Sequence, residues 1–311
     1  MIDFVVSGSR GFIGRQLMER LQTAGYSVMS DREFAHSQQQ AGTFVNCANI
    51  ADSPSQNLAL LETKIALAEG RCARFVQLQS FSTLVGSGRL SLDEPNCGLR
   101  PHVMNMYSAG KFEQERLLSR HAQRGFVPSV LLVYLPVVLG KGGSWSAAIA
   151  QSQRHGFLLP QPMPETARAN WVDVADIAAF LIDAHTEASA AGLRRVILNR
   201  PESASTTWPD LLGGAALAPA GASAKAELKE RAVAGAMRAI AMLSRLGLLV
   251  PLDGLLRKVL RAGDSAPKHT TAIPNEPLVF RSLMKTIARQ PYVPSTAVPA
   301  RPQFVPRSAA R

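Results

Sequence analysis

The chain has 311 residues, 46% of them hydrophobic and 18% charged, which suffices for one large domain or a domain with a smaller lobe and excludes a peptide-sized module. The first residues lack the pattern of a signal peptide, and no apolar run reaches about 18 residues, so we expect a cytoplasmic protein. The net charge of +11 lies at one end: residues 1–224 hold 19 Lys and Arg against 18 Asp and Glu, whereas residues 225–311 hold 15 against 5. A nucleic-acid groove is not predicted, because aromatic residues are only 6% and few lie near the basic positions.

Short apolar runs alternate with helical stretches through the first 200 residues. Strands are expected at 4–6, 26–29, 43–47, 75–79, 130–133 and 195–198. Helices are expected from the glycine-rich turn to Gly25, and at 57–69, 106–123 and 173–184. This alternation predicts an α/β fold, a Rossmann-like doubly wound parallel sheet with a smaller C-terminal lobe.

The domain organisation follows from where this alternation stops. Residues 1–165 are expected to form the dinucleotide-binding domain, with 166–200 returning to it. Residues 201–289 are expected to form a mainly helical substrate lobe. Residues 290–311, rich in proline and arginine, are expected to be a flexible tail.

The three cysteines do not form a recognisable disulfide or metal-binding motif. Cys47, Cys72 and Cys97 lack C-x-x-C spacing and nearby histidine clusters, which argues against a disulfide framework and a structural zinc site. We expect reduced, packed thiols and no metal.

Three glycines, Gly8, Gly11 and Gly14, lie between the first strand and the first helix. Glycines at this spacing allow a tight turn and let the backbone approach a pyrophosphate at the helix N-terminus. The same glycines could form a simple turn, but their place at the end of the first strand favours a dinucleotide site.

A second pattern, Tyr107-x-x-x-Lys111, places a phenol and an ammonium on one helix face. A nearby positive charge stabilises phenolate and lowers the tyrosine pKa, so Tyr107 could exchange a proton with a carbinol oxygen. Ser80, at the carboxyl end of a strand, could hydrogen-bond the same substrate oxygen. An exposed helical pair and a turn serine are the structural alternatives.

In this order the motifs resemble a family. The glycine pattern, Ser80, the Tyr107/Lys111 pair, YLPVVLG at 134–140 and NWVDVADIA at 170–178 look like an extended short-chain dehydrogenase/reductase of the NAD(P)-dependent epimerase/dehydratase branch. The resemblance covers roughly residues 1–200. It implies a Rossmann domain that holds NAD(P) and a lobe that closes over a substrate, most often a nucleotide-activated sugar.

The resemblance also implies roles for residues. Tyr107 would exchange the proton, Lys111 would hold the nicotinamide ribose, and Ser80 would hold the reacting oxygen. The cofactor-binding residues would be Gly8, Ser9, Arg10, Gly11, Phe12, Ile13, Gly14, Asp31, Arg32, Cys47, Ala48, Asn49, Tyr107, Lys111, Pro136 and Val138. The substrate-binding residues would be Ser82, Thr83, Trp145 and Arg168.

The chain departs from the family pattern at several positions. Only about a dozen residues separate Asp31 from Thr43, where relatives have an additional helix and strand, so the adenine side of the sheet is expected to be trimmed. Leu135 stands where relatives usually have an arginine before the proline, here Pro136. Ala169 stands where they usually have an arginine at the start of the Trp171 motif, and Arg168 is displaced from that position by one residue. These changes put the substrate-phosphate contacts in doubt.

Cofactor choice depends on the end of the second strand. Asp31 there would bind the ribose 2′-OH of NAD, whereas Arg32, together with Arg10, could bind the 2′-phosphate of NADP. We favour NADP(H), with NAD(H) as the alternative.

The predicted function is an NAD(P)-dependent oxidoreductase or epimerase acting on a nucleotide sugar, by NADPH-dependent keto-sugar reduction or 4-epimerisation through Ser80, Tyr107 and Lys111. One alternative is a ketoreductase for a non-sugar carbonyl. Another is a non-catalytic NADP-sensing Rossmann protein. The intact set of Ser80, Tyr107 and Lys111 counts against it, because a sensor needs no proton donor.

Residues 226–261 read as mainly helical, with Arg231, Arg238 and Arg245 at intervals of seven. Such a helix could lie on an anionic membrane surface, so that the protein would be peripheral to the inner face of a membrane. The alternative is a lobe helix whose arginines face water. A homodimer through the 106–123 helix is a further possibility, although Phe112, Leu117 and Leu118 could equally belong to the core.

Overall fold

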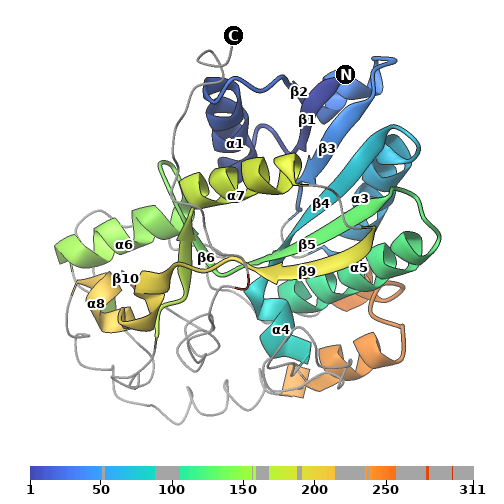
Figure 1. Ribbon diagram of the computed structural model, residues 1–311. Helices are drawn as coiled ribbons and strands as arrows, with labels where there is room; N and C mark the ends of the chain where they lie inside the picture. Colours follow the sequence, from blue (N-terminus) through green and yellow to red (C-terminus); the bar gives the residue numbers. More distant parts are fainter. Residues whose placement is uncertain are drawn as a thin grey trace.

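The computed structural model describes residues 1–50, 53–87, 106–155, 157–158, 168–187, 191–213, 235–236, 238–256, 278–279 and 296. Figure 1 shows the elements in space. In chain order they are β1 (Ile2–Ser7), α1 (Phe12–Thr23), β2 (Val28–Ser30), α2 (Asp31–Ala35), β3 (Ala41–Asn46), α3 (Pro54–Ala68), β4 (Cys72–Ser80), α4 (Phe81–Ser87), α5 (Met106–Gln123), β5 (Ser129–Leu135), β6 (Val137–Leu139), α6 (Ser144–His155), β7 (Phe157–Leu158), β8 (Trp171–Asp173), α7 (Val174–Thr186), β9 (Gly192–Ile197), a 3₁₀ turn (Pro201–Ala204), α8 (Trp208–Leu212) and β10 (Leu278–Val279).

The central sheet has six parallel strands in the order β2-β1-β3-β4-β5-β9. β6 pairs with β8 and β7 pairs with β10, each in a separate two-stranded parallel sheet. Helices α1 and α7 cover one face of the central sheet and α3 and α5 the other (Figure 1). The predicted α/β, Rossmann-like fold is confirmed.

The sheet ends at β2 within the described part of the chain, as the short spacing between Asp31 and Thr43 predicted. β2 has three residues and leads directly into α2, whose first turn is closed by a capping box: Glu33 N donates to Ser30 Oγ at 3.3 Å, and Ser30 N donates to the Glu33 carboxylate at 2.8 Å. α2 spans only five residues before the chain returns as β3. No strand lies beyond β2 among the described residues.

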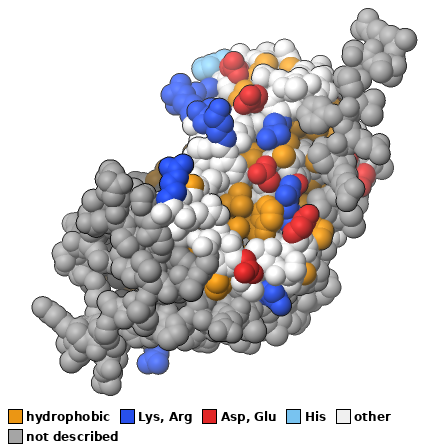
Figure 2. Space-filling model, turned by 90° about the vertical axis from the view of Figure 1, so that its left-hand side faces the viewer, with side chains coloured by type: hydrophobic (Ala, Val, Ile, Leu, Met, Phe, Trp, Pro, Cys, Tyr) orange, Lys and Arg blue, Asp and Glu red, His pale blue; other side chains and the backbone are white. Residues whose placement is uncertain are grey.

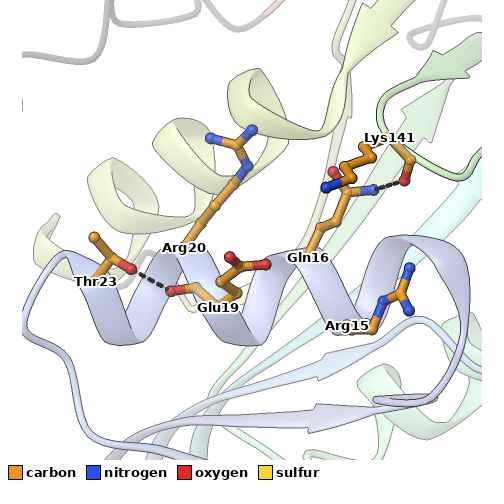
Figure 3. Close-up of a pocket in the computed structure, with 6 residues that line it drawn as sticks. All are labelled: Arg15, Gln16, Glu19, Arg20, Thr23 and Lys141. Carbon is orange, nitrogen blue, oxygen red and sulfur yellow. Dashed lines mark hydrogen bonds between the residues drawn. The ribbon is translucent and has the colours of Figure 1, made fainter.

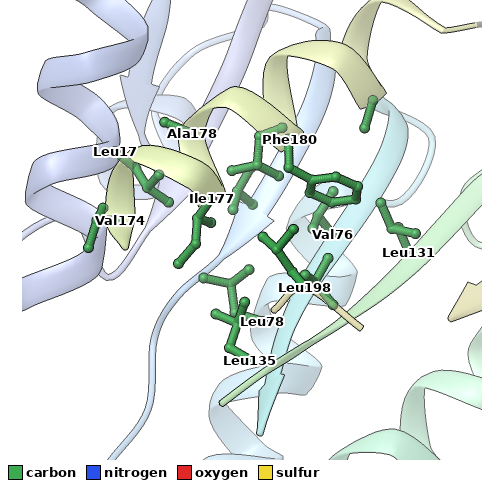
Figure 4. Close-up of a cluster of buried hydrophobic side chains, with 14 of the residues drawn as sticks. Leu17, Val76, Leu78, Leu131, Leu135, Val174, Ile177, Ala178, Phe180 and Leu198 are labelled. Carbon is green, nitrogen blue, oxygen red and sulfur yellow. The ribbon is translucent and has the colours of Figure 1, made fainter. Parts of the chain in front are cut away.

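Strand side chains alternate between two apolar cores because successive residues point to opposite faces of a sheet. On β4, Val76 and Leu78 belong to the core under α1 and α7, whereas Phe75 belongs to the core under α3 and α5. Figure 4 shows the first core, where Ile177 and Phe180 of α7 lie over the strands. Both cores hold the carboxyl ends of the strands in a fixed register.

Residues 238–256 pack against α5 rather than standing apart from the sheet domain. Ile240, Ala241 and Leu249 form a buried cluster with Met106, Ala109 and Phe112 of α5. Ser244 Oγ donates to the buried Glu113 carboxylate at 2.7 Å. On the other side of α5, Leu117 and Leu118 belong to the core under α3 and α5.

Asp253 fixes this segment to α3. Its carboxylate accepts a hydrogen bond from Ser55 N at 3.1 Å and another from Ser55 Oγ. Ser53, the residue before α3, provides no side-chain cap of its own. Asp253 therefore acts as the cap of α3 from a distant part of the chain.

The surface is mixed in charge on the face at the left of Figure 1. Figure 2 shows Lys and Arg side chains in the upper part of that face, with Asp and Glu side chains among them and a hydrophobic area below. None of the helices that the structure describes is both long and apolar enough to cross a bilayer. Of the cysteines, Cys72 is buried and Cys47 half-buried, both as free thiols, and Cys97 lies outside the described residues.

Candidate active site

The glycine loop between β1 and α1 is tight enough to exclude side chains at two of its positions. Gly8 has φ +73°, and a Cβ there would lie 2.9 Å from Ala48 N, in the loop after β3. A Cβ on Gly14 would lie 2.3 Å from Gly8 O. Gly11 N donates to Gly8 O at 2.9 Å and closes the turn. The loop therefore needs glycine for close approach of backbone to backbone.

The first turn of α1 follows this loop with neither a side-chain cap nor an acidic residue. Its backbone N–H groups and the positive end of the helix dipole are suited to an anion. Ser9 is half-buried and Arg10 is exposed. Phe12 and Ile13 pack partly into the core under α1, and Phe12 leaves room only for glycine at Gly143, where a Cβ would lie 2.5 Å from its ring.

The loop after β3 lies against the glycine loop. Cys47 N donates to Ser7 O at 3.1 Å, and Ala48 N donates to Asn46 Oδ1 at 3.2 Å. Asn49 follows and is exposed. Farther along the sheet edge, half-buried Pro136 links β5 to β6, and Val138 lies within β6.

Lys111 lies buried at the same edge of the sheet. Its Nζ donates to Leu78 O, near the end of β4, at 3.4 Å, and Gln79 Nε2 donates to the Lys111 backbone oxygen at 3.1 Å. Burial lowers the pKa of Lys111 to about 8, and Cys47 acts in the other direction. Burial likewise raises the pKa of Cys47 to about 12, and Lys111 opposes that shift. With these pKa values, Cys47 is a neutral thiol at every pH at which Lys111 is mainly charged.

Tyr107 lies on the same helix as Lys111, and Ser80 lies on β4, the strand that Lys111 Nζ contacts. Ser80 ends β4; its Oγ lies 2.9 Å from Ser82 Oγ and accepts a hydrogen bond from Ser82 N at 3.2 Å. Tyr107 lies one turn before Lys111 on α5, and its side chain is 38% exposed. Thus α5 carries a solvent-accessible phenol and a buried ammonium, and β4 brings a hydroxyl to the same sheet edge.

Asp31 and Arg32 differ in their surroundings. The Asp31 carboxylate forms an ion pair with Lys64 Nζ of α3 at 2.7 Å, and both side chains are largely buried. Arg32 is exposed. Lys64 was absent from the predicted site residues, since only the folded chain brings residue 64 to the end of β2.

The residues expected to bind substrate lie in two places. Ser82 and Thr83 are on α4, where Ser82 is half-buried and Thr83 is fully buried. Trp145 of α6 packs against Trp208 of α8, with ring centroids 5.7 Å apart. Arg168 pairs with Thr207 in an isolated bridge and donates to Ser205 O at 3.2 Å. Trp145 and Arg168 therefore lie with α6 and α8, beside a small apolar core of their own.

A groove of about 560 Å³ runs along α1 and includes none of the predicted site residues. Gln16 Nε2 donates to Lys141 O at 3.2 Å in it (Figure 3). Its lining consists of Arg15, Gln16, Glu19, Arg20, Thr23 and Lys141. The predicted site is instead defined by the backbone contacts and buried groups at the carboxyl edge of the sheet.

No protein-family model matches the sequence, and no curated protein matches it. Solved structures do match the fold. MoeE5 in complex with UDP-glucose and NAD has 19% identity and a TM-score of 0.50, over 65% of this chain and 80% of that one. UDP-N-acetylglucosamine 4-epimerase from Bacillus cereus has 13% identity and a TM-score of 0.50, over 65% and 76%. Epimerase Mth375 from Methanothermobacter thermautotrophicus has 14% identity and a TM-score of 0.51, over 68% and 75%. The chain therefore shares the fold of these proteins.

Proposed function

We propose that the protein is an NAD(P)-dependent oxidoreductase or epimerase that acts on a nucleotide-activated sugar. One observation carries the proposal: three stretches far apart in sequence meet at one edge of the sheet. The glycine loop approaches Ala48 closely, and Lys111 of α5 reaches the end of β4, where its buried Nζ donates to Leu78 O. The carboxyl edge of a parallel sheet is where ligands of doubly wound folds bind.

The residues present fit a dinucleotide. A Cβ at Gly8 or Gly14 would collide with backbone, so the loop leaves its surface as bare backbone, which suits close approach of a pyrophosphate. The first turn of α1, without a cap or an acid, offers N–H donors to the same group. When bound, a nicotinamide dinucleotide supplies hydride transfer.

The chain's own residues supply the proton chemistry. Tyr107, with its exposed phenol, gives or takes the proton at the substrate oxygen. Lys111, with a pKa of about 8, is mainly protonated near neutral pH, and its charge one helical turn away favours the phenolate form of Tyr107. Its ammonium also holds a ribose hydroxyl, and Ser80 Oγ holds the reacting oxygen.

We favour NADP(H). Arg10 and Arg32 are both exposed and follow the neighbouring strands β1 and β2. Lys64 neutralises the Asp31 carboxylate, which removes the charge that would repel a 2′-phosphate and occupies the group that would bind a ribose 2′-OH. NAD remains the alternative, because MoeE5 is described in complex with NAD.

For the substrate we propose a nucleotide sugar, bound at the carboxyl edge of the sheet. MoeE5 is described in complexes with UDP-glucose and with UDP-glucuronic acid. A second candidate is a ketoreductase for a non-sugar carbonyl. It is favoured by Arg168, which is engaged by Ser205 O, and by Leu135, which is buried where relatives have arginine.

Fluorescence titration of the full chain with NADPH and with NADH, repeated in the presence of UDP-, GDP- and dTDP-sugars, tests the proposal. Tight binding of NADPH that responds to one nucleotide sugar is expected. Consumption of NADPH during turnover would identify a reductase, and sugar conversion without net consumption would identify a 4-epimerase. Binding of neither cofactor would overturn the proposal, and binding without turnover of any carbonyl would favour the NADP-sensing alternative.

A further inference from the structure

The groove along α1 is lined by polar and charged side chains alone. Its volume of about 560 Å³ lies within the range of roughly 300–1,000 Å³ that is usual for small-molecule sites. The helix and the loop after β6 supply Arg15, Gln16, Glu19, Arg20, Thr23 and Lys141. Small-molecule sites are mostly apolar, so this lining suits a small ligand that is itself charged and polar.

The groove carries cations that are not engaged elsewhere. Within the part of the chain that the structure describes, the side chains of Arg15, Arg20 and Lys141 form no ion pair or hydrogen bond. The Glu19 carboxylate, which lies between the two arginines on α1 (Figure 3), likewise pairs with none of the described residues. Three cations against one carboxylate leave the lining positive. An anionic ligand would therefore bind these charges without breaking an internal ion pair.

The backbone holds Lys141 beside α1. Gly140 and Gly142 on either side of it have φ of +150° and +79°, a conformation that favours glycine. The buried side chain of Gln16 ties the loop to the helix, because its Nε2 donates to Lys141 O at 3.2 Å. A Cβ on Gly142 would lie 3.4 Å from Arg15 Nη2, so the Arg15 guanidinium lies next to the loop that carries Lys141.

The two ends of the groove differ in chemistry. Arg15 belongs to the first turn of α1, which has no acidic residue, and the loop with Lys141 lies beside it. Glu19 and Thr23 lie one and two turns farther along the helix, and Arg20 lies in its last turn. The first end is therefore suited to a phosphate, whereas the second offers both an acceptor and donors to the hydroxyl groups of a ligand.

We propose that the groove along α1 binds a small sugar phosphate. Arg15 and Lys141 bind the phosphate through charge-assisted hydrogen bonds, and Glu19 and Arg20 bind sugar hydroxyls as acceptor and donor. A sugar is favoured over a second anionic group because the Glu19 carboxylate accepts hydrogen bonds from hydroxyls but repels an anion. This site includes none of the residues of the candidate active site, and the inference is independent of the proposed chemistry.

Isothermal titration calorimetry of the full chain with glucose 6-phosphate, inorganic phosphate and glucose tests the inference. Glucose 6-phosphate is expected to bind with a Kd of roughly 1 mM or below, and more tightly than the other two compounds. Its binding should weaken as the salt concentration rises. Arg15→Gln and Lys141→Gln should each raise its Kd by about fivefold, because both side chains are exposed.

Glu19→Ala distinguishes a sugar phosphate from a bare anion. The substitution removes an acceptor for sugar hydroxyls and also removes a negative charge from the groove. It should therefore weaken the binding of glucose 6-phosphate and strengthen the binding of inorganic phosphate. Tighter binding of both compounds would overturn the assignment to a sugar phosphate.

Two arginine variants outside the groove serve as controls. Arg124→Gln removes an exposed charge just after α5, and Arg10→Gln removes an exposed charge from the glycine loop. Both should bind glucose 6-phosphate as the parent chain does, and thermal unfolding of every variant should match the parent. Absence of binding, or an equal loss in Arg124→Gln, would overturn the inference. A loss in Arg10→Gln without a loss in the groove variants would place the ligand at the glycine loop, which would overturn the inference and leave the proposed function intact.

Discussion

The carboxylate of Asp31 and the ammonium of Lys64 lie 2.7 Å apart, joining the start of α2 to α3. Asp31 stands at the end of β2, where an acid selects NAD by binding the ribose 2′-OH. The Asp31 carboxylate is therefore already engaged by Lys64 at the position where the proposed site would use it. Under the proposed function, cofactor preference would depend on Lys64, a residue that need not touch the cofactor.

Lys64→Met should free Asp31 and shift the preference toward NADH. The free carboxylate would accept a hydrogen bond from the 2′-OH and repel a 2′-phosphate, so the ratio of the Kd values should change by about tenfold or more. Titrations with both cofactors measure it. Lys64→Arg keeps the pair and serves as the control; the same ratio in both variants would contradict the role of the ion pair.

Arg32→Ala should weaken NADPH more than NADH, because only NADPH carries the 2′-phosphate. A charge-assisted hydrogen bond contributes about 1.5–3 kcal/mol, which corresponds to roughly 10- to 100-fold in Kd for NADPH. Arg124→Ala, at an exposed position near the far end of α5, is the matched control. An equal loss for both cofactors would remove the 2′-phosphate argument.

Tyr107→Phe should abolish turnover and leave cofactor binding nearly intact, because the substitution removes the proton donor but keeps the ring. General acid–base catalysis of this kind contributes about 10²- to 10⁴-fold. Steady-state kinetics with the identified sugar and cofactor titration measure the two effects separately. Unchanged turnover would exclude Tyr107 as the acid.

Lys111→Met should raise stability near neutral pH. The folded-state pKa of about 8 lies below the ordinary value of 10.5, so between these values the unfolded chain binds more protons and stability rises with pH. Below about pH 8 the buried ammonium is charged and costs stability, which Lys111→Met should restore by about 2–3 kcal/mol. Urea unfolding at about pH 7 and about pH 10 measures this, and the gain should shrink at the higher pH. A gain that is the same at both pH values would show that the buried charge of Lys111 is not its cause.

Gly14→Ala should disrupt the loop, since its Cβ would lie 2.3 Å from Gly8 O and backbone would have to move. Cofactor affinity is expected to fall by at least about tenfold, and the free energy of unfolding by about 1–3 kcal/mol. Gly254→Ala meets no atom within 4 Å and is the control. Equal effects in both variants would show that the loss is not due to this contact.

The helices and strands of the sheet domain were predictable where the sequence signals are local. The residues at which they begin were less predictable. The strand expected from Tyr26 begins instead at Val28, because Ser27 N and Oγ bind the Asp3 carboxylate at 2.8 and 2.7 Å. The helix expected from residue 57 begins at Pro54, which suits a first turn because it lacks an N–H. Helix α6 was not predicted.

The site was predictable only as separate stretches. The glycine spacing and the Tyr107/Lys111 pair can be seen in sequence, but the contact between Gly8 and Ala48 requires β1 and β3 to be neighbours. Likewise, the contact of Lys111 Nζ with Leu78 O and the pairing of Asp31 with Lys64 depend on tertiary packing. These residue assignments remain predictions that the experiments above test.

The contact between Asp253 and Ser55 bears on the order in which the chain folds. The two residues are 198 positions apart, and a ribosome adding about 5–20 residues per second needs roughly 10–40 s to make the intervening chain. During that time α3 lacks its cap, and Met106, Ala109 and Phe112 of α5 lack the residues that bury them. The nascent sheet domain therefore still exposes this apolar face of α5 after its two larger cores are complete, until residues 240–249 are made.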